Sequence, residues 1–423
     1  MMTRKFILFL ASLIIFSTVI RLWRINEPAR YYFDEVYHVV TARAYAQNNP
    51  AAYDPFSPPP EEGTAYDWLH PPLAKLMQAA SIKLFGDNPV AWRLPSAIFG
   101  AALILATAVL ATVMFGKRAG VFSGLILGFE NLTFVMSRIT MNDIFITFFA
   151  VCAFIFATLY LEKQKLIWIF LTSVFLGLAI ASKWTGFYAI IAILIFLSIS
   201  CIKNHKSLLP LSLLIVIPFF IYLASYGQFW IQKHSIRQFI DLHKQIWWYQ
   251  NRSDLQHPYG TTAIFCTPKG LEGPKTWCPW ILDIRGVYFS LETYGSKNGY
   301  IYALGNPLIF WSGIIAISYQ IGKFITERKL ILTLAIFGYF IFWIPWIFTP
   351  RLLFLYHYLP SLPFLAIALG LLLGDIWETK FKFLTILAIL IFALSFFYFY
   401  PITSGFPINP QLLEKFMWFS TWR

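Results

Sequence analysis

Long runs of apolar residues, separated by short polar gaps, dominate the chain. An α-helix needs about 20 such residues to cross the hydrocarbon core of a bilayer. By this measure the pattern predicts about eleven transmembrane helices. The predicted spans are 6–20, 94–115, 119–136, 144–161, 166–181, 186–201, 208–229, 300–321, 330–348, 352–373 and 383–400. The sequence therefore predicts an all-α integral membrane protein, a single polytopic domain over residues 1–423 whose last helices occupy 300–423.

Basic residues gather in every second gap between the predicted spans, at 117–118, 162–165, 203–206, 323–329 and 380–382. Cytoplasmic loops of membrane proteins carry such an excess of Lys and Arg, so the N-terminus, with Arg4 and Lys5, is expected in the cytoplasm. The first span has the basic start of a signal peptide. It is followed by Arg21-Leu-Trp-Arg24 and not by a small-residue cleavage site, so we expect a retained helix.

Two long gaps fall on the opposite side of the membrane, at 24–93 and 230–299. Both are rich in Pro, Trp, Tyr and charged residues. Binding and catalytic residues are found on loops more often than on the scaffold that holds them. We therefore expect the chemistry on the extracytoplasmic side.

The composition agrees with a membrane protein and gives no indication of a nucleic-acid partner. Only 13% of the residues are charged and 58% are hydrophobic, whereas soluble domains carry about 25% charged residues. The excess of 33 Lys and Arg over 20 Asp and Glu lies mostly in the short gaps, where it sets topology and meets anionic headgroups, so no nucleic-acid partner is expected. Cys152 and Cys201 lie in apolar runs, whereas Cys266 and Cys278 share the second long gap and can pair in an oxidising compartment.

Two segments of the first long gap carry candidate chemistry. Asp34 and Glu35 directly follow the first span, where adjacent carboxylates can serve as a general base, hold a metal or line a cation path. They can equally be a solvated acidic pair beside Arg30. Further along, Pro71 and Pro72 fix the backbone after His70, and Lys75 follows about one turn later.

Several cations are predicted at the same outer level. Arg138 precedes Asp143 at the end of the third span and can form an ion pair with it, extend to headgroups or bind a phosphate. Lys183 and Arg351 lie at ends of other spans. Single interfacial cations are usually anchors, but several beside an acidic pair favour an anionic ligand. In the second long gap, Trp277 and Trp280 can stack on a sugar or belong to the aromatic belt.

Taken in order, these segments resemble the protein O-mannosyltransferase family of integral-membrane glycosyltransferases. The matches extend over nearly the whole transmembrane region and keep the order of the family. The matching segments are Arg21, Phe33-Asp34-Glu35, His70-Pro-Pro-Leu-Ala-Lys75, Ser137-Arg138 with Asp143, Lys183-Trp-Thr-Gly186, Gly305-Asn-Pro307 and Tyr356-His-Tyr-Leu-Pro360.

The resemblance implies the GT-C fold and a polyprenyl- or dolichyl-phosphate-mannose donor. It implies Asp34 as the general base on a Ser or Thr hydroxyl of a protein, with Glu35 supporting the site. No nucleotide sugar, cofactor or obligatory metal is implied. The implied phosphate contacts are Arg138, Arg21, His70 and Arg351, and the implied supporting residues are Lys75, Asp143, Lys183, His357 and Tyr358.

The chain departs from the eukaryotic members because its second long gap has no room for a soluble domain of a few hundred residues. It thus resembles the prokaryotic members, and a plasma-membrane location in a prokaryote is expected. Related transferases on the same scaffold modify lipids or glycans, so another acceptor or sugar stays open. A transporter or flippase is the second alternative, but the sequence shows no convincing internal repeat and its polar residues gather on one side.

Overall fold

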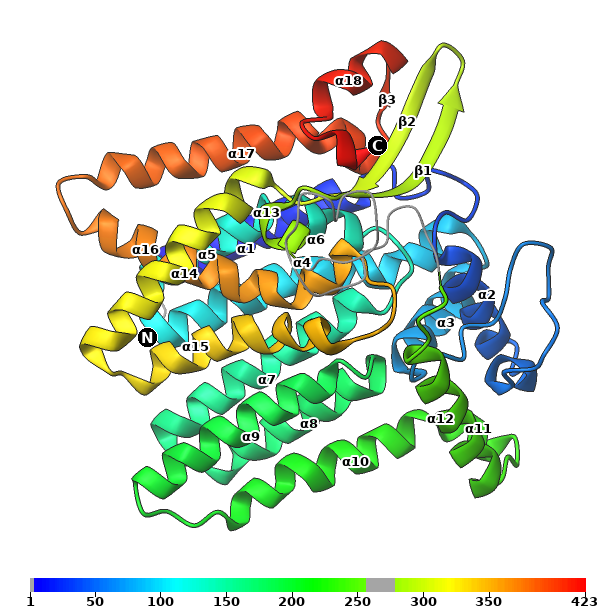
Figure 1. The fold of residues 1–423 in the computed structure, drawn as a ribbon, viewed down its shortest axis with the longest axis horizontal. Helices are drawn as coiled ribbons and strands as arrows, with labels where there is room; N and C mark the ends of the chain where they lie inside the picture. Colours follow the sequence, from blue (N-terminus) through cyan, green and yellow to red (C-terminus); the bar gives the residue numbers. More distant parts are fainter. Residues whose placement is uncertain (1–3, 256–277) are drawn as a thin grey trace.

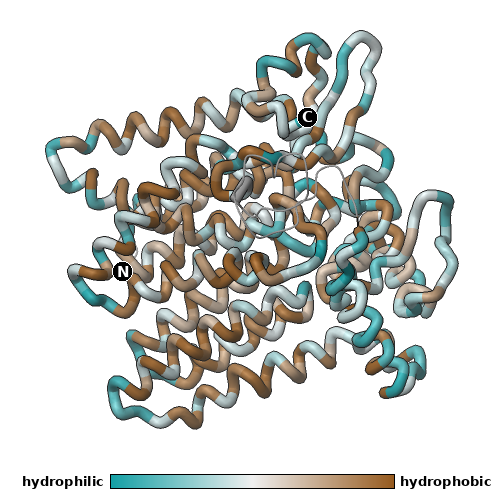
Figure 2. Tube along the Cα trace, in the orientation of Figure 1, coloured by the Kyte–Doolittle hydropathy of each residue, from teal (hydrophilic) through white to brown (hydrophobic). Residues whose placement is uncertain are grey.

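The computed structural model describes residues 4–255 and 278–423. Its apolar helices lie side by side in one bundle, and most of the longer connections gather at one end of it, on the right in Figure 1. We call this end, which carries residues 24–87, 226–255 and 283–306, the loop end. Hydropathy follows the same division, because the bundle is apolar along its length and the polar residues concentrate at its two ends (Figure 2).

The bundle contains the expected membrane spans. Eight helical segments are long and apolar enough to cross a membrane, and two shorter apolar segments, Leu166–Ser182 and Leu209–Ser225, lie among them. The predicted membrane class is therefore confirmed, whereas the count of eleven stays a prediction. The helices of the bundle are α1 Arg4–Leu22, α4 Pro89–Phe115, α5 Lys117–Gly128, α6 Asn131–Met136, α7 Asp143–Lys163, α8 Leu166–Ser182, α9 Gly186–Lys203, α10 Leu213–Ser225, α14 Pro307–Glu327, α15 Leu330–Ile341, α16 Leu362–Trp377 and α17 Lys382–Ser404.

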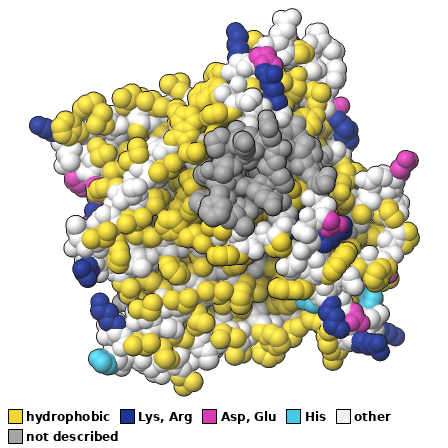
Figure 3. All heavy atoms as spheres, in the orientation of Figure 1, with side chains coloured by type: hydrophobic (Ala, Val, Ile, Leu, Met, Phe, Trp, Pro, Cys, Tyr) yellow, Lys and Arg dark blue, Asp and Glu magenta, His cyan; other side chains and the backbone are white. Residues whose placement is uncertain are grey.

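The outer surface of the bundle is apolar. Hydrophobic side chains cover most of the visible face, and the charged side chains lie near its two ends (Figure 3). The spans α1 and α17 are the least buried and α7 and the segment Leu355–Trp377 the most buried. The first two therefore present apolar side chains to lipid, and the latter two form the centre of the bundle.

Several predicted spans are interrupted in the structure, among them those over 119–136 and 300–321. The span predicted over 119–136 is broken after α5, because the Glu130 carboxylate accepts hydrogen bonds from the backbone N–H groups of Leu132 (2.9 Å) and Thr133 (2.6 Å) and so begins α6. The span predicted over 300–321 starts as strand β2, Lys297–Ala303, and α14 begins only at Pro307. Proline supplies the first turn of that helix, where its missing N–H costs nothing.

The loop end has its own secondary structure. The first long gap folds into α2 and α3, and the second contains α11, α12, α13 and strand β1. Strands β1 and β2 form an antiparallel hairpin, with β3 paired to β2. The bounds are α2 Glu35–Ala46, α3 Leu73–Phe85, α11 Gly227–Ile231, α12 Ile236–Gln250, α13 Cys278–Leu282, β1 Val287–Tyr294, β3 Pro407–Ile408 and α18 Leu413–Phe416, with 3-10 turns at Pro50–Tyr53, Leu209–Ser212, Ile344–Phe348, Leu355–Ser361, Pro410–Leu412 and Ser420–Trp422.

Candidate active site

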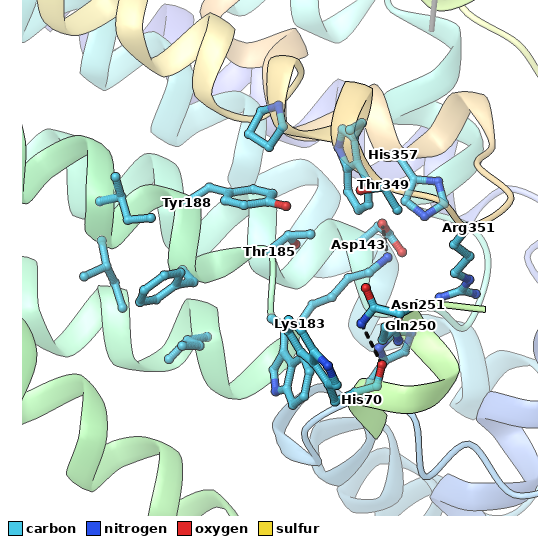
Figure 4. A pocket seen from close by; sticks show the side chains of 18 of the residues that line it. His70, Asp143, Lys183, Thr185, Tyr188, Gln250, Asn251, Thr349, Arg351 and His357 are labelled. Atoms are coloured by element: carbon cyan, nitrogen blue, oxygen red, sulfur yellow. Dashed lines mark hydrogen bonds and ion pairs between the residues drawn. The ribbon is translucent and has the colours of Figure 1, made fainter. Parts of the chain in front are cut away.

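A cavity of about 890 Å³ lies where the bundle meets the loop end. One part is polar and the other is apolar, so the cavity as a whole is amphipathic (Figure 4). The polar part contains Asp34, His38, His70, Asp143, Lys183, Gln250, Asn251, Arg351 and His357. The apolar part contains Ile180, Phe187, Ile190, Ile191, Leu194, Ile215, Pro218, Phe219 and Phe348, mostly from α8, α9 and α10.

Asp34 borders the polar part from the residue that precedes α2. Its side chain makes no capping hydrogen bond to that helix, so its carboxylate is not used to stabilise the helix end. The preceding residue, Phe33, has a left-handed backbone (φ 50°) and stacks on Phe289, with 4.1 Å between ring centroids. Burial raises the pKa of Asp34 to about 6, with His38 and Lys183 opposing the shift and Asp67 and Asp143 adding to it.

Glu35 belongs to the scaffold and is not among the residues that line the cavity. Both of its carboxylate oxygens accept hydrogen bonds from Arg93, at 2.8 Å each, and both side chains are fully buried. The carboxylate also accepts the backbone N–H groups of Thr140 (3.1 Å) and Tyr32 (3.3 Å). Glu35 therefore joins α2 to α4 and to the start of α7, and supports Asp34 through the backbone and not through direct chemistry.

His70 reaches the cavity as predicted, but Lys75 does not. The Lys75 ammonium is buried and donates to the Asp67 carboxylate (2.7 Å) and to the Asp67 carbonyl (2.5 Å). Burial alone would raise the pKa of Asp67, but Lys75, His70 and His38 together hold it well below its usual value. Lys75 therefore keeps a buried carboxylate ionised directly behind the cavity wall.

Asp143, the first residue of α7, lines the cavity, but its partner is Lys183 and not Arg138. The Lys183 ammonium lies 2.7 Å from the Asp143 carboxylate, and both residues line the polar part. Figure 4 shows the lysine directed at this carboxylate from the loop between α8 and α9. The same ammonium is 6.0 Å from the centroid of the Tyr356 ring. Among the described residues, Asp143 is thus the one carboxylate within ion-pair distance of this buried cation in the cavity wall.

Arg138 and Arg21 lie outside the cavity. The Arg138 guanidinium donates to the carbonyl groups of Arg21 (2.7 Å), Trp23 (2.7 Å) and Arg24 (3.2 Å), beyond the C-terminal end of α1. Arg21 donates to the Ser17 side chain (2.6 Å), and its guanidinium lies 5.8 Å from the Phe134 ring. The structure therefore uses Arg138 to hold the end of α1, where orphan carbonyls need donors, and it brings neither arginine to the cavity.

Arg351 and His357 reach the cavity from the opposite wall. Arg351 donates to Gln250 and lies 5.3 Å over the Tyr249 ring, so α12 orients its guanidinium. The His357 ring stacks on Trp280, with ring centroids 6.2 Å apart. Trp280 is 1% exposed and is therefore a support for His357 and not a stacking surface for a sugar.

The other predicted residues lie elsewhere. Tyr358 is buried and shares a hydrogen bond of 2.6 Å with the Tyr339 hydroxyl. Trp277 and Cys266 lie outside the described residues, so the disulfide with Cys278 stays a prediction. Among residues 4–255 and 278–423, no group of three His, Cys, Asp or Glu side chains could hold a metal ion. The metal-independent reaction likewise stays a prediction.

Three residues of one cavity wall were not predicted from the sequence as site residues. The Trp184 indole donates to the Tyr222 hydroxyl (2.9 Å), which shares a hydrogen bond with His243 Nε2 (2.7 Å). His243 Nδ1 in turn contacts the Phe239 carbonyl (2.7 Å). These residues come from α10, α12 and the loop before α9, and only the fold brings them together. His38 was also missed, although its position one turn after Asp34 on α2 would have indicated it.

Family models match the chain from end to end. Residues 11–235 match the model described as dolichyl-phosphate-mannose-protein mannosyltransferase. Residues 235–422 match the C-terminal four-transmembrane region of protein O-mannosyltransferase. The chain belongs to the protein O-mannosyltransferase family. Membership makes the protein a membrane glycosyltransferase and decides against the transporter alternative.

Named relatives and solved structures agree with this family. The polyprenol-phosphate-mannose–protein mannosyltransferase of Corynebacterium glutamicum is 26% identical over 84% of the chain and 81% of its own length. The Mycobacterium tuberculosis protein of the same name is 23% identical over the same shares.

The fold also matches the Saccharomyces cerevisiae Pmt1–Pmt2 complex bound to its sugar donor, with a TM-score of 0.80 and 16% identity over 100% of the chain and 93% of that chain. ArnT of Cupriavidus metallidurans bound to undecaprenyl phosphate aligns with a TM-score of 0.61 and 13% identity over 93% and 76%. The GT-C fold expected from the resemblance is therefore confirmed.

Proposed function

We propose that this protein transfers a mannosyl residue from a polyprenyl- or dolichyl-phosphate carrier to Ser or Thr hydroxyls of proteins. The observation that carries the proposal is the amphipathic cavity, in which an unengaged carboxylate and two cations border one end of a long apolar pocket. A lipid-phosphate sugar has the same division into an apolar chain and an anionic head. The names of the relatives support mannose as the sugar and protein as the acceptor.

The cavity suggests how the donor would lie. The isoprenoid chain would occupy the apolar part between α8, α9 and α10. Its phosphate would then lie near Lys183, Arg351 and His357, because a phosphate in this low-dielectric setting needs cationic donors. The sugar would extend toward Asp34. This placement needs neither Arg138 nor Arg21, which do not line the cavity.

The proposed reaction is a single displacement with inversion at the anomeric carbon. Asp34 accepts the proton of the acceptor hydroxyl while that oxygen forms its bond to the sugar. The bond between the anomeric carbon and the phosphate oxygen breaks, and its electron pair stays on the phosphate, next to Lys183 and Arg351. A carboxylate with a pKa of about 6 is ionised at neutral pH and is a stronger base than an ordinary Asp.

We further propose that the loop end faces outward from the plasma membrane of a prokaryote, with the N-terminus in the cytoplasm. The short connections at the other end of the bundle carry basic pairs and runs, such as Lys117 with Arg118 and Lys380 with Lys382. Such residues favour the cytoplasmic side. The acceptor would then be an exported protein, and the lipid bilayer would supply the donor.

The test compares purified wild-type protein with Asp34→Asn, using radiolabelled polyprenyl-phosphate-mannose and a Ser/Thr-rich peptide. The matched control is Asp54→Asn, which changes an exposed carboxylate of the same loop. We expect labelled peptide from wild type and from the control, and none from Asp34→Asn. A folded Asp34→Asn variant with normal turnover would remove Asp34 as the base. Label on lipid or glycan but not on peptide would favour the alternative acceptor class.

A further inference from the structure

His38 lies on α2, four residues and so about one helical turn after Asp34. Its backbone N–H donates to the Asp34 carbonyl at 3.0 Å, so the two side chains project from the same side of the helix. Both residues line the polar part of the cavity. The His38 ring is 5% exposed and lies parallel to that of His70, with the ring centroids 6.2 Å apart. A second group able to accept a proton therefore stands beside the proposed base.

The surroundings of His38 determine which of its two ring nitrogens is available to accept a proton. Its Nδ1 lies 3.1 Å from the Asp67 carboxylate, which Lys75 holds in place with an ion pair of 2.7 Å. The contact is not aligned as a hydrogen bond, but an ionised carboxylate at this distance repels a lone pair and so favours the proton of neutral His38 on Nδ1. Nε2 then carries the lone pair and is the proton-accepting atom.

The charges that face His38 are nearly balanced. Its own helix supplies Asp34, while the carboxylate of Glu35 is taken up by Arg93. The segment before α3 and α3 itself supply Asp67, His70 and Lys75, and the ion pair of Asp143 with Lys183 faces the same cavity from α7 and from the α8–α9 loop. Two paired cations are thus set against three carboxylates, so a positive His38 would be offset by Asp34 and Asp67.

We propose that His38 is a second proton acceptor of the site, which takes from Asp34 the proton that Asp34 removes from the acceptor hydroxyl. The proposal rests on the function proposed above. In the transfer step the hydroxyl oxygen forms a bond to the anomeric carbon, and its proton passes to Asp34, which becomes a neutral acid. The bond between the anomeric carbon and the phosphate oxygen breaks, and its electron pair stays on the phosphate. Asp34 then gives its proton through a bridging water to His38 Nε2, which restores the carboxylate and forms an imidazolium beside Asp67. Water takes this proton as the product leaves.

Two substitutions separate proton acceptance from a structural role. His38→Asn keeps a side-chain N–H donor near the place of Nδ1 and can still contact Asp67, whereas His38→Gln places its amide near Nε2. Neither amide can accept a proton at neutral pH. The control is His205→Gln. His205 is exposed in the short connection after α9 and does not line the cavity. All variants are compared for thermal stability, donor KM, and the pH dependence of kcat.

We expect both His38 variants to remain folded, to keep the donor KM and to lose about tenfold or more in kcat, within the range of positioned acid–base groups. A folded His38→Asn variant with wild-type kcat would overturn the proposal and leave a structural contact to Asp67. If wild type transfers no mannose at all, the proposed function fails first, independently of His38.

Discussion

Substitution of Glu35 is expected to reduce stability and to leave the chemistry of Asp34 in place. Arg93 is fully buried, and its guanidinium donates to both oxygens of Glu35 and to the carbonyl groups of Ile25, Pro28 and Arg30, at 2.8–3.1 Å. This arginine therefore joins α4 to the chain between α1 and α2. Glu35 is the only carboxylate within ion-pair distance of it among the described residues.

The magnitude follows from the burial of the pair. Removing one partner of a buried ion pair leaves the other charge uncompensated and costs about 3–5 kcal/mol. Glu35→Gln keeps the shape and one oxygen for Thr140, so we expect about 3 kcal/mol, near the lower end. Glu35→Ala removes both acceptors of Arg93 and should cost about 5 kcal/mol. Replacing the pair together, as Glu35→Gln with Arg93→Met, should recover part of this loss.

The assay is equilibrium unfolding in mixed SDS and dodecyl maltoside micelles, followed by tryptophan fluorescence. Asp34→Asn is the matched comparison, one residue away. It should be no less stable than wild type, because a carboxyl whose folded pKa is raised to about 6 is ionised at neutral pH at the expense of stability. A Glu35→Ala variant as stable as wild type would refute the scaffold role. A Glu35→Gln variant that is stable but inactive would show that Glu35 takes part in catalysis.

Four further outcomes are expected. The kcat of wild type should fall as pH is lowered through about 6, where Asp34 becomes protonated and can no longer accept a proton, and a flat profile from pH 7.5 to 5 would contradict this. Arg351→Ala should raise the donor KM about tenfold or more, because a hydrogen bond to a charged group is worth about 1.5–3 kcal/mol, and Arg351→Lys should raise it less. Phe219→Asp should raise the KM about tenfold for a long polyprenyl donor but not for a short-chain analogue, since only a long chain would reach this part of the cavity. Gly100→Ala should lower the free energy of unfolding by about 1–3 kcal/mol, because its Cβ would lie 2.2 Å from that of Ser137.

The sequence by itself determined the class of the protein and predicted several of the polar residues that line the cavity. Apolar runs of membrane length leave little choice of structure. Backbone N–H and C=O groups in lipid have no water to bind, and a single continuous run satisfies them within itself by forming an α-helix. The acidic motif at Asp34, and Lys183, Arg351, His70 and His357, were all predicted and all line the cavity. Lys183 and Arg351 lie at junctions between an apolar run and a polar gap, which hydropathy marks directly, whereas Asp34 and His70 were predicted from their local motifs and His357 from the family resemblance.

Only the tertiary structure decided which partner each charge has. Asp143 pairs with Lys183 and not with the nearer Arg138 in sequence, because Arg138 turns toward the open carbonyl groups after α1. Likewise Glu35, adjacent to Asp34, points away from the cavity to Arg93. Neighbours on a helix project about 100° apart, so sequence proximity cannot assign both to one site. The break before α6 and the strand before α14 were also invisible to hydropathy, because Glu130 and the tyrosines of β2 are buried by contacts with distant segments.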